Sequence, residues 1–427
     1  MNFIFHTLGC KVNQYETESL RECLAERGHT CDSTLPTEAI IINSCTVTAE
    51  SDRKTRQLLR RLRRENPAAL IVLTGCMVQA FPSAGESLVE ADIVVGNSDI
   101  VNTCNLIDEW QKNRMRRVEI TPHLKGELYR TPAISRFCER TRAFMKIEDG
   151  CDRYCSYCII PTARGRVRSR ALSDIKSEAE ALAKSGYSEI VLTGINLSAY
   201  GLNEEFDMCD AVDTVCAVDG IKRVRLGSLE PDHITDGMLQ RLSGQNKFCE
   251  QFHLSLQSGC DATLTRMNRH YDSTFYFDLV NRIRSAFPDA AITTDIMVGF
   301  AGESDEEFKQ SLEFAQKVGF ARAHIFAYSR REGTVAARLS GQVTKQQKES
   351  RARLMAEVTA KSEREFISAQ CGRVFPVLFE TCENGYAEGY TPNYTRVRVQ
   401  TDQPLTGKII PVQLKTAEDG YCTGTII

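Results

Sequence analysis

The chain alternates short apolar runs with amphipathic stretches, first over residues 2–111 and again over 143–327. Short apolar runs bounded by turn residues are typical of buried strands, and strands that alternate with helices build parallel sheets. In the first region we predict four strands, at residues 2–6, 39–43, 69–74 and 92–95. Helices are expected near 13–27 and 49–64, so residues 1–112 should fold as a small doubly wound parallel sheet.

The second α/β region follows residues 113–136, a stretch of mixed charge with two prolines that we interpret as a linker with room for one short strand. Six strands are predicted beyond it, at 143–147, 189–193, 223–226, 251–256, 291–298 and 322–327. Six βα repeats fit a partial, TIM-like (βα)6 barrel better than a full eightfold one. Residues 137–367 are therefore predicted to form this barrel, ending in a long charged helix near 344–369.

The last part of the chain, residues 368–427, has a different pattern. Runs that alternate apolar and polar residues lie between Gly, Pro, Asn and Asp turns, at 373–379, 395–400, 409–414 and 421–426. This pattern predicts a small antiparallel β-barrel of about five strands, similar to an OB fold. The fold class is thus α/β, with a third, all-β domain at the C-terminal end.

Composition restricts the partners. The 427 residues include 53 Lys and Arg against 56 Asp and Glu, a net charge of −3, which argues against a uniformly basic nucleic-acid binder but allows local patches. We expect no DNA partner. The apolar runs are far shorter than the ~20 residues that cross a bilayer, and the first residues lack a basic leader, so we expect no membrane partner and a cytoplasmic location.

Seventeen cysteines are the unusual feature of the composition. An odd number in a chain without an export signal makes a disulfide framework unlikely and favours metal binding or catalysis. The strongest local signal is Cys151, Cys155 and Cys158, a C-x3-C-x2-C segment placed after the first strand of the predicted barrel. Closely spaced thiolates bind soft metal centres such as iron–sulfur clusters. The alternative is zinc held by three cysteines and a fourth ligand.

Three thiols leave one iron of a four-iron cluster open, and an open iron can chelate the amino and carboxylate groups of S-adenosylmethionine. The spacing resembles that of the radical SAM superfamily.

A second, dispersed triplet is formed by Cys10, Cys45 and Cys76, each just beyond the C-terminal end of a predicted strand. Because the carboxyl ends of neighbouring parallel strands meet at one crevice, these thiols should converge on a second metal site. Glycines before Cys10 and Cys76 would let the backbone turn tightly there. The alternative is three independent buried cysteines. Small buried apolar residues are also the expectation for the other eleven: Cys23, Cys31, Cys104, Cys138, Cys209, Cys216, Cys249, Cys260, Cys371, Cys382 and Cys422.

Polar residues follow several predicted barrel strands, where TIM-like barrels carry their sites. Gly194 and Asn196 follow the second strand, Glu230 the third and Gln257 the fourth. We predict that they line a cavity for a nucleoside cofactor, with Glu230 and Gln257 bound to its ribose or methionine part. Ordinary loop structure is the alternative.

Arginines alternate just after the clustered cysteines, at Arg164, Arg166, Arg168 and Arg170. We expect them on one side of an extended segment near the site, in contact with an RNA backbone or with the cofactor carboxylate. Arg166 is the one assigned to the cofactor. Plain surface charge is the alternative.

Residues 53–64 contain seven basic residues in twelve and no acid. If this stretch is a helix, Leu58, Leu59 and Leu62 face the sheet. The outer side would then carry Arg53, Arg56, Arg60 and Arg64. A solvated face normally mixes signs, so contact with RNA phosphates is favoured over mere solubility.

Taken together, the two triplets and the terminal barrel resemble the radical SAM methylthiotransferase family over nearly the whole chain. Residues 7–17, TLGCKVNQYET, and 43–48, NSCTVT, are most similar to the branch called MtaB. Residues 389–395, GYTPNYT, followed by Arg396 and Arg398, are similar to the family's C-terminal RNA-binding TRAM domain. Two stretches depart from the family pattern: Ala301 replaces a proline, and 328–334, YSRREGT, differs from the usual form.

The resemblance implies that Cys151, Cys155 and Cys158 hold one 4Fe-4S cluster and the dispersed triplet a second, auxiliary one. An electron from the first cluster would cleave S-adenosylmethionine to a 5′-deoxyadenosyl radical, which abstracts hydrogen from C2 of an adenine. The auxiliary cluster would carry the sulfur, methylated by another S-adenosylmethionine. Such a C–H bond is not acidic, so the cofactor does the hard step and the protein positions it.

The implied substrate is N6-threonylcarbamoyladenosine at position 37 of tRNA, in the anticodon stem-loop, and the implied electron donor is a flavodoxin or a ferredoxin. Related branches of the family act on isopentenyladenosine in tRNA or on a ribosomal-protein aspartate. A hypothesis of another class is a non-catalytic iron–sulfur sensor that binds RNA. The polar strand ends of the barrel favour the enzyme.

Overall fold

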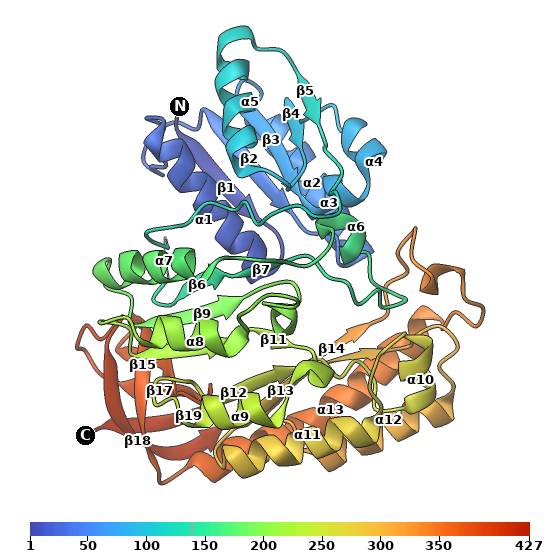
Figure 1. Cartoon of the computed structure of the whole chain (residues 1–427), viewed down its shortest axis with the longest axis vertical. Coiled ribbons are helices and arrows are strands. Elements are labelled where there is room, and N and C mark those ends of the chain that lie inside the picture. The colour runs from blue at the N-terminus through green and yellow to red at the C-terminus, as the bar shows by residue number, and fades with distance from the viewer. Residues whose placement is uncertain (138–139) are drawn as a thin grey trace.

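The computed structural model describes residues 1–137 and 140–427, and Cys138 lies outside these described residues. Three sheet systems follow one another along the chain. Figure 1 shows an N-terminal α/β layer in blue and cyan, a central α/β layer in green and yellow, and a red β-barrel beside the central layer. In the part of the chain that the structure describes, no helix is long and apolar enough to cross a membrane.

The N-terminal sheet is parallel, with the strand order β1-β2-β3-β4-β5. Its strands are β1 (Phe3–Thr7), β2 (Ala39–Ser44), β3 (Leu70–Gly75), β4 (Ile93–Val95) and β5 (Arg117–Glu119). Its helices are α1 (Lys11–Glu26), α2 (Ala49–Glu65), α3 (Cys76–Ala80), α4 (Pro82–Glu86) and α5 (Ile100–Asn113). The four predicted strands are confirmed, and the fifth comes from the stretch interpreted as a linker.

Helices cover both faces of this sheet. On one face, α1 and α5 bury Leu24 and Ile107 against the side chains of β1, β2 and β3. On the other face, α2 buries Leu59 and Leu62 against the alternate side chains of β2, β3 and β4. Strands buried on both faces read as continuous apolar runs, which is why they could be found in the sequence.

The central layer holds the six predicted parallel strands. They are β6 (Ala143–Lys146), β9 (Glu189–Thr193), β10 (Arg223–Leu226), β12 (Gln251–Leu254), β13 (Ala291–Val298) and β14 (Arg322–Ala327). Hydrogen bonding gives the orders β10-β9-β6 and β11-β12-β13-β14, and the short β11 (Ser228–Leu229) follows β10 after one glycine. The six strands therefore form one open, TIM-like barrel wall, as predicted.

The short helix α6 (Ile160–Arg164) packs against α3 of the N-terminal layer. The other helices of the central layer cover the outside of this wall. They are α7 (Leu172–Lys184), α8 (Met208–Cys216), α9 (Asp236–Ser243), α10 (Asp261–Arg266), α11 (Ser273–Ala286) and α12 (Asp305–Val318). One continuous apolar core joins them to the strands. Short 3-10 turns lie at Leu197–Ala199, Pro231–His233 and Ala336–Arg338, and a small antiparallel pair is formed by β7 (Glu148–Asp149) and β8 (Arg168–Ser169).

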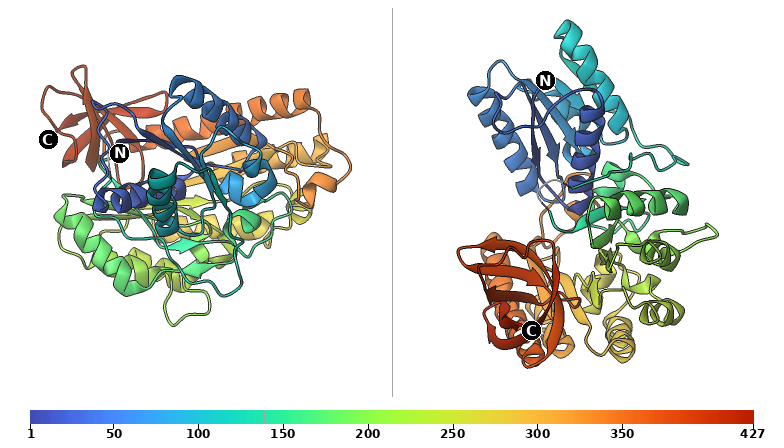
Figure 2. Two further views of the ribbon diagram at one scale, coloured as in Figure 1. Left: turned by 90° about the horizontal axis from the view of Figure 1, so that it is seen from above. Right: turned by 90° about the vertical axis from the view of Figure 1, so that its left-hand side faces the viewer.

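The long predicted helix is α13 (Lys345–Gln370), which connects the open barrel to the C-terminal one. Arg351 near its start is buried and ion-paired to Glu303, with Nη1 and Oε2 2.7 Å apart. Ile367 near its end lies in the apolar core of the C-terminal barrel. One helix thus has its two ends packed into two different domains, and Figure 2 shows it running beside both.

The C-terminal barrel is closed, with the order β15-β16-β17-β19-β18. Its strands are β15 (Val374–Glu383), β16 (Tyr386–Tyr390), β17 (Arg396–Gln400), β18 (Ile409–Glu418) and β19 (Tyr421–Ile426). Four of the pairings are antiparallel, and β17 with β19 is parallel, so the antiparallel prediction holds for all but one pair.

Candidate functional site

The first cysteine triplet lies on a single loop after β7. Cys151 N–H donates to the Gly165 carbonyl at 3.0 Å, and Cys158 N–H donates to the Cys155 carbonyl at 2.9 Å. Burial raises the pKa of the Cys158 thiol to about 12, and negative charge on Cys155 adds to this shift. Burial also raises the pKa of Cys151, with further contributions from Cys158 and Cys155. The three thiols of the loop therefore lie near enough to influence one another's pKa.

An arginine that the sequence did not indicate contacts this triplet. Arg269 Nη1 donates to Cys155 Sγ at 3.2 Å, and Arg269 Nη2 donates to Glu230 Oε2 at 2.5 Å. Glu230 lies where it was predicted, beside the triplet, but its carboxylate is bound to a protein cation. Its position orients Arg269 toward the sulfur.

Gly194 and Asn196 meet at a buried carboxyl group, that of Glu148. The Asn196 N–H donates to Glu148 Oε2 at 2.7 Å, and a Cβ on Gly194 would lie 2.5 Å from the same oxygen. Burial raises the pKa of Glu148 well above its ordinary value. Among the described residues, Glu148 Oε1 and Asn196 Oδ1 are buried without a hydrogen-bond partner. These two oxygens are candidate contacts for a polar ligand beside the triplet.

Gln257 lines a cavity of about 170 Å³ next to the same loop. Its φ of +67° places it in the left-handed region, and its Oε1 is buried without a partner among the described residues. Backbone strain of this kind is common at functional sites. Other lining residues are Tyr157, Cys158, Asp295, Met297 and Phe326.

The four alternating arginines do not share one exposed side. Arg164 ends helix α6 and is fully buried, and Arg170 is buried with its Nη1 2.6 Å from Glu178 Oε2. Arg168 Nη2 lies 3.4 Å from Asp149 Oδ2. Only Arg166 of the four is exposed. The prediction that the four arginines share one side of an extended segment is therefore wrong, because Arg164 ends a helix and three of the guanidinium groups neutralise internal carboxylates.

The second triplet converges as the sheet geometry predicts. Cys10, Cys45 and Cys76 follow β1, β2 and β3, and a Cβ on Gly9 would lie 3.1 Å from Cys45 Cβ. Gly75 has a φ of +99°, and a Cβ there would lie 2.5 Å from backbone atoms of Ser44. Burial raises the pKa of Cys76 to about 11, with contributions from Cys10 and Cys45. Both glycines let the chain turn tightly where the thiols meet.

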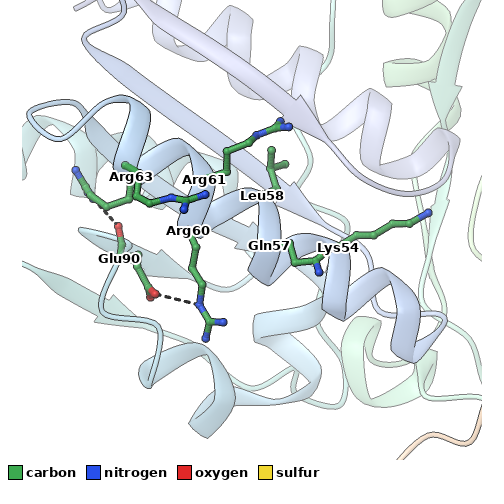
Figure 3. Close-up of a pocket in the computed structure, with 8 residues that line it drawn as sticks. Lys54, Gln57, Leu58, Arg60, Arg61, Arg63 and Glu90 are labelled. Carbon is green, nitrogen blue, oxygen red and sulfur yellow. Dashed lines mark hydrogen bonds and ion pairs between the residues drawn. The ribbon is translucent and has the colours of Figure 1, made fainter.

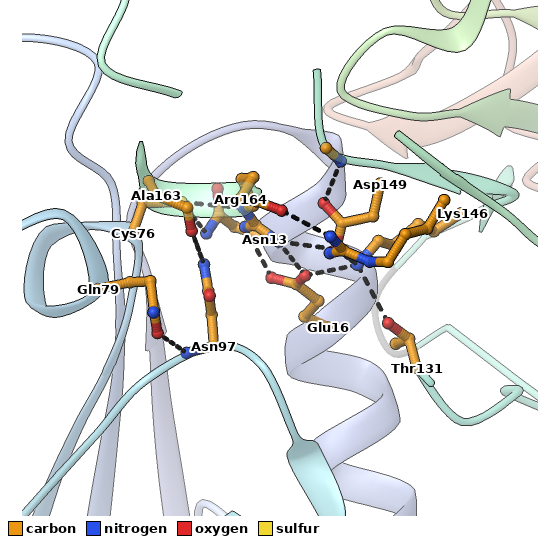
Figure 4. Close-up of polar contacts among 12 residues, drawn as sticks. Asn13, Glu16, Cys76, Gln79, Asn97, Thr131, Lys146, Asp149, Ala163 and Arg164 are labelled. Atoms are coloured by element: carbon orange, nitrogen blue, oxygen red, sulfur yellow. Dashed lines mark hydrogen bonds and ion pairs between the residues drawn. The ribbon is translucent and has the colours of Figure 1, made fainter. Parts of the chain in front are cut away.

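Three side chains donate to the sulfur of Cys76, as Figure 4 shows in part. Arg164 Nε lies 3.2 Å from Cys76 Sγ, and Asn13 Nδ2 and Asn97 Nδ2 each lie 3.9 Å from it. Asn97 Nδ2 also donates to the Ala163 carbonyl at 3.0 Å. Donors to sulfur from outside the triplet are a common feature of iron–sulfur sites, where they tune the cluster potential.

Arg164 also belongs to a buried charge network that joins α1 to the barrel (Figure 4). Its Nη2 lies 2.9 Å from Glu16 Oε2, and Lys146 Nζ lies 2.8 Å from Glu16 Oε1. Lys146 Nζ lies in addition 2.6 Å from Asp149 Oδ2. These cations lower the pKa of Glu16 against the opposing effect of burial, which is the largest single influence. Because Asp149 is two residues before Cys151, the network connects the two triplets.

The donor types at both triplets suit iron–sulfur clusters, because each site combines three cysteines with a guanidinium group that donates to one of the sulfurs. In residues 1–137 and 140–427, no group of three or more His, Cys, Asp or Glu side chains is arranged to hold a metal ion.

The remaining cysteines follow the expectation only in part. Cys104, Cys209, Cys216, Cys249, Cys260 and Cys422 are buried as expected. Cys23, Cys371 and Cys382 are half-buried, and Cys31 is exposed, so the expectation of burial is wrong for Cys31. The Sγ atoms of Cys23 and Cys104 lie 2.9 Å apart.

The basic stretch is helix α2, and its outer side forms a concave surface of about 710 Å³, shown in Figure 3. Arg53, Arg60 and Arg64 are exposed, and Arg56 is half-buried. Two of the arginines are partnered locally, Arg53 with Glu50 at 2.5 Å and Arg60 with Glu90 at 3.2 Å. Arg53 and Arg56 are not among the residues that line the concave surface, which are Lys54, Gln57, Leu58, Arg60, Arg61, Arg63, Arg64 and Glu90.

The C-terminal barrel is held against the central layer by the GYTPNYT segment. Tyr390 and Tyr394 stack with ring centroids 4.6 Å apart, and the guanidinium of Arg142 lies over both rings. Arg225 Nη1 donates to the Pro392 carbonyl at 2.8 Å. The GYTPNYT segment therefore contacts the neighbouring domain.

The two arginines that follow this segment point elsewhere. Arg396 is exposed and ion-paired with Glu388, and Arg398 Nε lies 3.5 Å from the same carboxylate.

Family patterns match two parts of the chain. The Radical SAM superfamily pattern matches residues 145–315, and that of Uncharacterized protein family UPF0004 matches residues 2–96. Relatives match almost the whole chain. The threonylcarbamoyladenosine tRNA methylthiotransferase MtaB of Bacillus subtilis (strain 168) is 36% identical over 94% of this chain and 91% of its own length.

Two further relatives show the range of the family. The MtaB protein of Thermotoga maritima is 36% identical over 91% of this chain and 89% of its own length. A tRNA-2-methylthio-N(6)-dimethylallyladenosine synthase of Clostridium botulinum (strain Loch Maree / Type A3) is 33% identical over 88% of this chain and 86% of its own length.

Among solved structures, the radical S-adenosylmethionine methyltransferase TsrM of Kitasatospora setae, with cobalamin and a [4Fe-4S] cluster bound, has a similar fold. The TM-score is 0.58 at 15% identity, over 90% of this chain and 82% of that one.

Proposed function

The chain belongs to the radical SAM methylthiotransferase family, and on that basis we propose that it converts N6-threonylcarbamoyladenosine at tRNA position 37 into its 2-methylthio derivative. The reaction replaces the C2–H bond of the adenine with a C–S bond to a methylthio group. The observation that carries the proposal is the pair of thiol triplets, placed at two strand-end sites and joined by one buried charge network.

Membership of the family implies a 4Fe-4S cluster and S-adenosylmethionine. Cys151, Cys155 and Cys158 would hold that cluster. We propose that Cys10, Cys45 and Cys76 hold a second 4Fe-4S cluster. When bound, these groups would supply two things. One-electron cleavage of S-adenosylmethionine would give a radical that can break an unactivated C–H bond, and the second cluster would supply the sulfur that is transferred.

The protein's own residues hold and orient these groups. Arg269 and Arg164 each donate to a cysteine sulfur at 3.2 Å, and such donors stabilise the negative charge of a thiolate-bound centre. The unpartnered oxygens of Asn196 and Gln257 would accept hydrogen bonds from the ammonium or ribose hydroxyls of S-adenosylmethionine. Gly194 keeps the backbone close to Glu148, and Arg166 is exposed beside the loop and would meet the cofactor carboxylate.

The RNA would contact two cationic surfaces. On α2, the exposed guanidinium groups line a concave surface that suits phosphates, and Arg396 and Arg398 would add contacts from the C-terminal barrel. We propose that residues 1–112, completed by β5, form the methylthiotransferase domain, that the rest of the stretch up to residue 136 is a linker, and that 137–367 form the radical SAM core and 368–427 a TRAM domain. A flavodoxin or a ferredoxin would deliver the electron, and tRNA as substrate suggests that the reaction takes place in the cytoplasm.

The test is anaerobic reconstitution of the purified chain with iron and sulfide, followed by reaction with S-adenosylmethionine, a reductant and an anticodon stem-loop that carries N6-threonylcarbamoyladenosine. We expect 5′-deoxyadenosine and the 2-methylthio nucleoside, both measured by mass spectrometry. About eight irons per chain are expected for two four-iron clusters. Reaction only with a dimethylallyladenosine stem-loop would contradict the substrate, and failure to form any 5′-deoxyadenosine would contradict the enzyme and favour an iron–sulfur RNA-binding sensor.

A further inference from the structure

The relatives of this chain act on adenosines that differ in the group attached at N6. Their names give threonylcarbamoyladenosine for one set and dimethylallyladenosine for the other, at 36% and 33% identity. The first group carries a carboxylate and a hydroxyl, and the second is a hydrocarbon. Because both sets share the fold, a few side chains near the reacting base must distinguish an anionic group from an apolar one.

A polar surface of the barrel wall lies beside the first triplet. It begins at the cavity that Cys158 and Asp295 line. It continues along the inside of the barrel wall, where His253 Nε2 lies 3.4 Å from Asp295 Oδ2 and the rings of His253 and His324 are 6.1 Å apart. We call these three residues, Asp295, His253 and His324, the barrel-wall triad.

Lys11 faces the barrel-wall triad from the N-terminal domain. It is the first residue of α1, directly after Cys10, and its side chain is exposed. Its Nζ lies 5.9 Å from the centroid of the Phe144 ring on β6, so the amine points away from its own sheet toward the barrel. His324 of β14 is close enough to Lys11 for the two charges to influence each other. Lys11 therefore lies beside the second triplet, on the side of its domain that faces the open barrel.

Two arginines, Arg142 and Arg225, and one carboxylate, that of Glu189, lie near Lys11. Glu189 is already shared by Arg225 Nε at 2.9 Å, Arg223 Nη1 at 3.4 Å and Arg142 Nη1 at 3.9 Å. Within the described residues, Lys11 itself has no carboxylate in ion-pair contact, whereas the neighbouring arginines are bound to Glu189 or to the C-terminal barrel. This leaves its ammonium group available to an incoming anion.

We propose that Lys11 binds the carboxylate of the threonylcarbamoyl group and thereby selects this substrate over one with a dimethylallyl group. The inference rests on the proposed function, because it presumes that the modified adenine reacts between the two triplets. A hydrocarbon at N6 would have to displace water from the ammonium group without replacing its hydrogen bonds, which disfavours its binding. Lys11 is thus a specificity-determining residue for the reaction.

The experiment compares Lys11→Met and Lys11→Arg with the wild-type reconstituted protein on two anticodon stem-loops. One carries N6-threonylcarbamoyladenosine and the other the same nucleoside with its carboxylate converted to a neutral carboxamide. Dissociation constants are measured by fluorescence anisotropy without reductant, and KM and kcat are measured from the rate at which the methylthio product forms.

For Lys11→Met we expect binding of the carboxylate RNA to weaken by about 10- to 100-fold, as for loss of a hydrogen bond between charged groups. Binding of the carboxamide RNA should change by less than about twofold, and Lys11→Arg should keep most of the preference.

The matched control is Lys176→Met on α7, an exposed lysine on the outer surface of the barrel, which should bind both RNAs as the wild type does. Iron content and 5′-deoxyadenosine formed without RNA should stay at the wild-type level in Lys11→Met. A loss of iron would overturn the inference and assign Lys11 to the support of the neighbouring cysteine.

Equal weakening of both RNAs would overturn it in favour of a phosphate contact, and no weakening of either would overturn it outright. Failure of the proposed function is distinguishable, because the wild-type protein would then form no methylthio product on the carboxylate RNA. If the wild-type protein also bound the two RNAs equally, recognition of the carboxylate by Lys11 would be contradicted together with the proposed function.

Discussion

Cys151, Cys155 and Cys158 come from one loop, whereas Cys10, Cys45 and Cys76 come from three strand ends that lie far apart in the sequence. The first triplet is shaped by hydrogen bonds within its own segment and to the neighbouring loop at Gly165. The second exists only when the parallel sheet has formed, because its members meet at the common edge of β1, β2 and β3. A local triplet depends on few contacts, and a dispersed one depends on the fold of a whole domain.

The two triplets are alike in one respect. Each has an arginine that donates to one sulfur at 3.2 Å and is itself bound to a glutamate, Arg269 with Glu230 and Arg164 with Glu16. In both cases the arginine comes from the central layer. The dispersed triplet is therefore completed by a residue of another domain, and the local one by a residue of its own.

The largest effect is expected from removing one cysteine of each triplet. Cys158→Ala should abolish both 5′-deoxyadenosine and methylthio product, whereas Cys76→Ala should abolish only the methylthio product. The reason is that S-adenosylmethionine cleavage requires the local triplet alone. Mass spectrometry of both products after anaerobic reconstitution tests this. Iron should fall from about eight to about four per chain in either variant. Loss of 5′-deoxyadenosine in Cys76→Ala would show that the triplets do not act separately.

Removing the arginines should affect stability. Arg164→Met leaves Glu16 facing Lys146 alone in a buried site, and loss of one partner of a buried ion pair costs about 3–5 kcal/mol. Arg269→Met should cost a similar amount at Glu230, with unfolding by urea as the measurement. The control is Arg282→Met, which breaks an exposed pair with Asp236 and should cost less than about 1 kcal/mol. Equal values for all three variants would contradict the role of burial.

Substitution of Gly75, beside the dispersed triplet, should reduce stability by more than the strain of its positive φ alone. Gly75→Ala places a Cβ 2.5 Å from Ser44 backbone atoms at a φ of +99°, so we expect a loss of about 2–5 kcal/mol from strain and overpacking together. Gly186→Ala has a φ of +92° but nothing within 4 Å of the new Cβ, so about 1–2 kcal/mol is expected. Thermal unfolding and iron content measure both effects. If the two variants lose the same stability and retain the same iron, the close approach at Gly75 has no role.

The smallest effect concerns Glu148, beside the local triplet. Burial raises the pKa of this carboxyl in the folded protein above the 4.5 of an unfolded chain. The stability that its protonation contributes is therefore complete below pH 4.5 and is lost as the pH rises toward the folded pKa. The slope is at most about 1.4 kcal/mol per pH unit. Glu148→Gln cannot ionise, so its free energy of unfolding should exceed that of the wild type progressively above pH 4.5. If the free energies of unfolding of the two proteins changed in parallel with pH, the raised pKa of Glu148 would be contradicted.

The sequence predicted the elements better than the contacts between them. The six barrel strands and the convergence of Cys10, Cys45 and Cys76 follow from local patterns and from the geometry of parallel sheets. Pairings between distant segments leave no such pattern. Arg331, in the stretch that departs from the family form, is buried with its Nη2 2.7 Å from Asp52 Oδ2, and neither residue could be matched to the other in advance.

The same limit explains what was wrong. The arginines from 164 to 170 alternate in sequence, and alternation predicts one face only if the segment is extended. In the structure, Arg164 ends a helix and finds Glu16, which lies 148 residues away in the chain. Likewise, nothing near Tyr394 in the sequence indicates that the guanidinium groups of Arg142 and Arg225 lie over its ring.

Helix α13 fixes the distance and the orientation between the open barrel and the C-terminal barrel. Its 26 residues span about 39 Å at 1.5 Å per residue, with Arg351 bound in the open barrel and Ile367 in the closed one. Its length acts as a rigid strut, so the C-terminal barrel takes one orientation relative to the barrel opening. One residue inserted between these two anchors would turn the C-terminal barrel by about 100° around the helix axis and advance it by about 1.5 Å. The stacked pair Tyr390 and Tyr394 would then face away from Arg142, and any RNA path that spans both barrels would be broken without a change in either triplet.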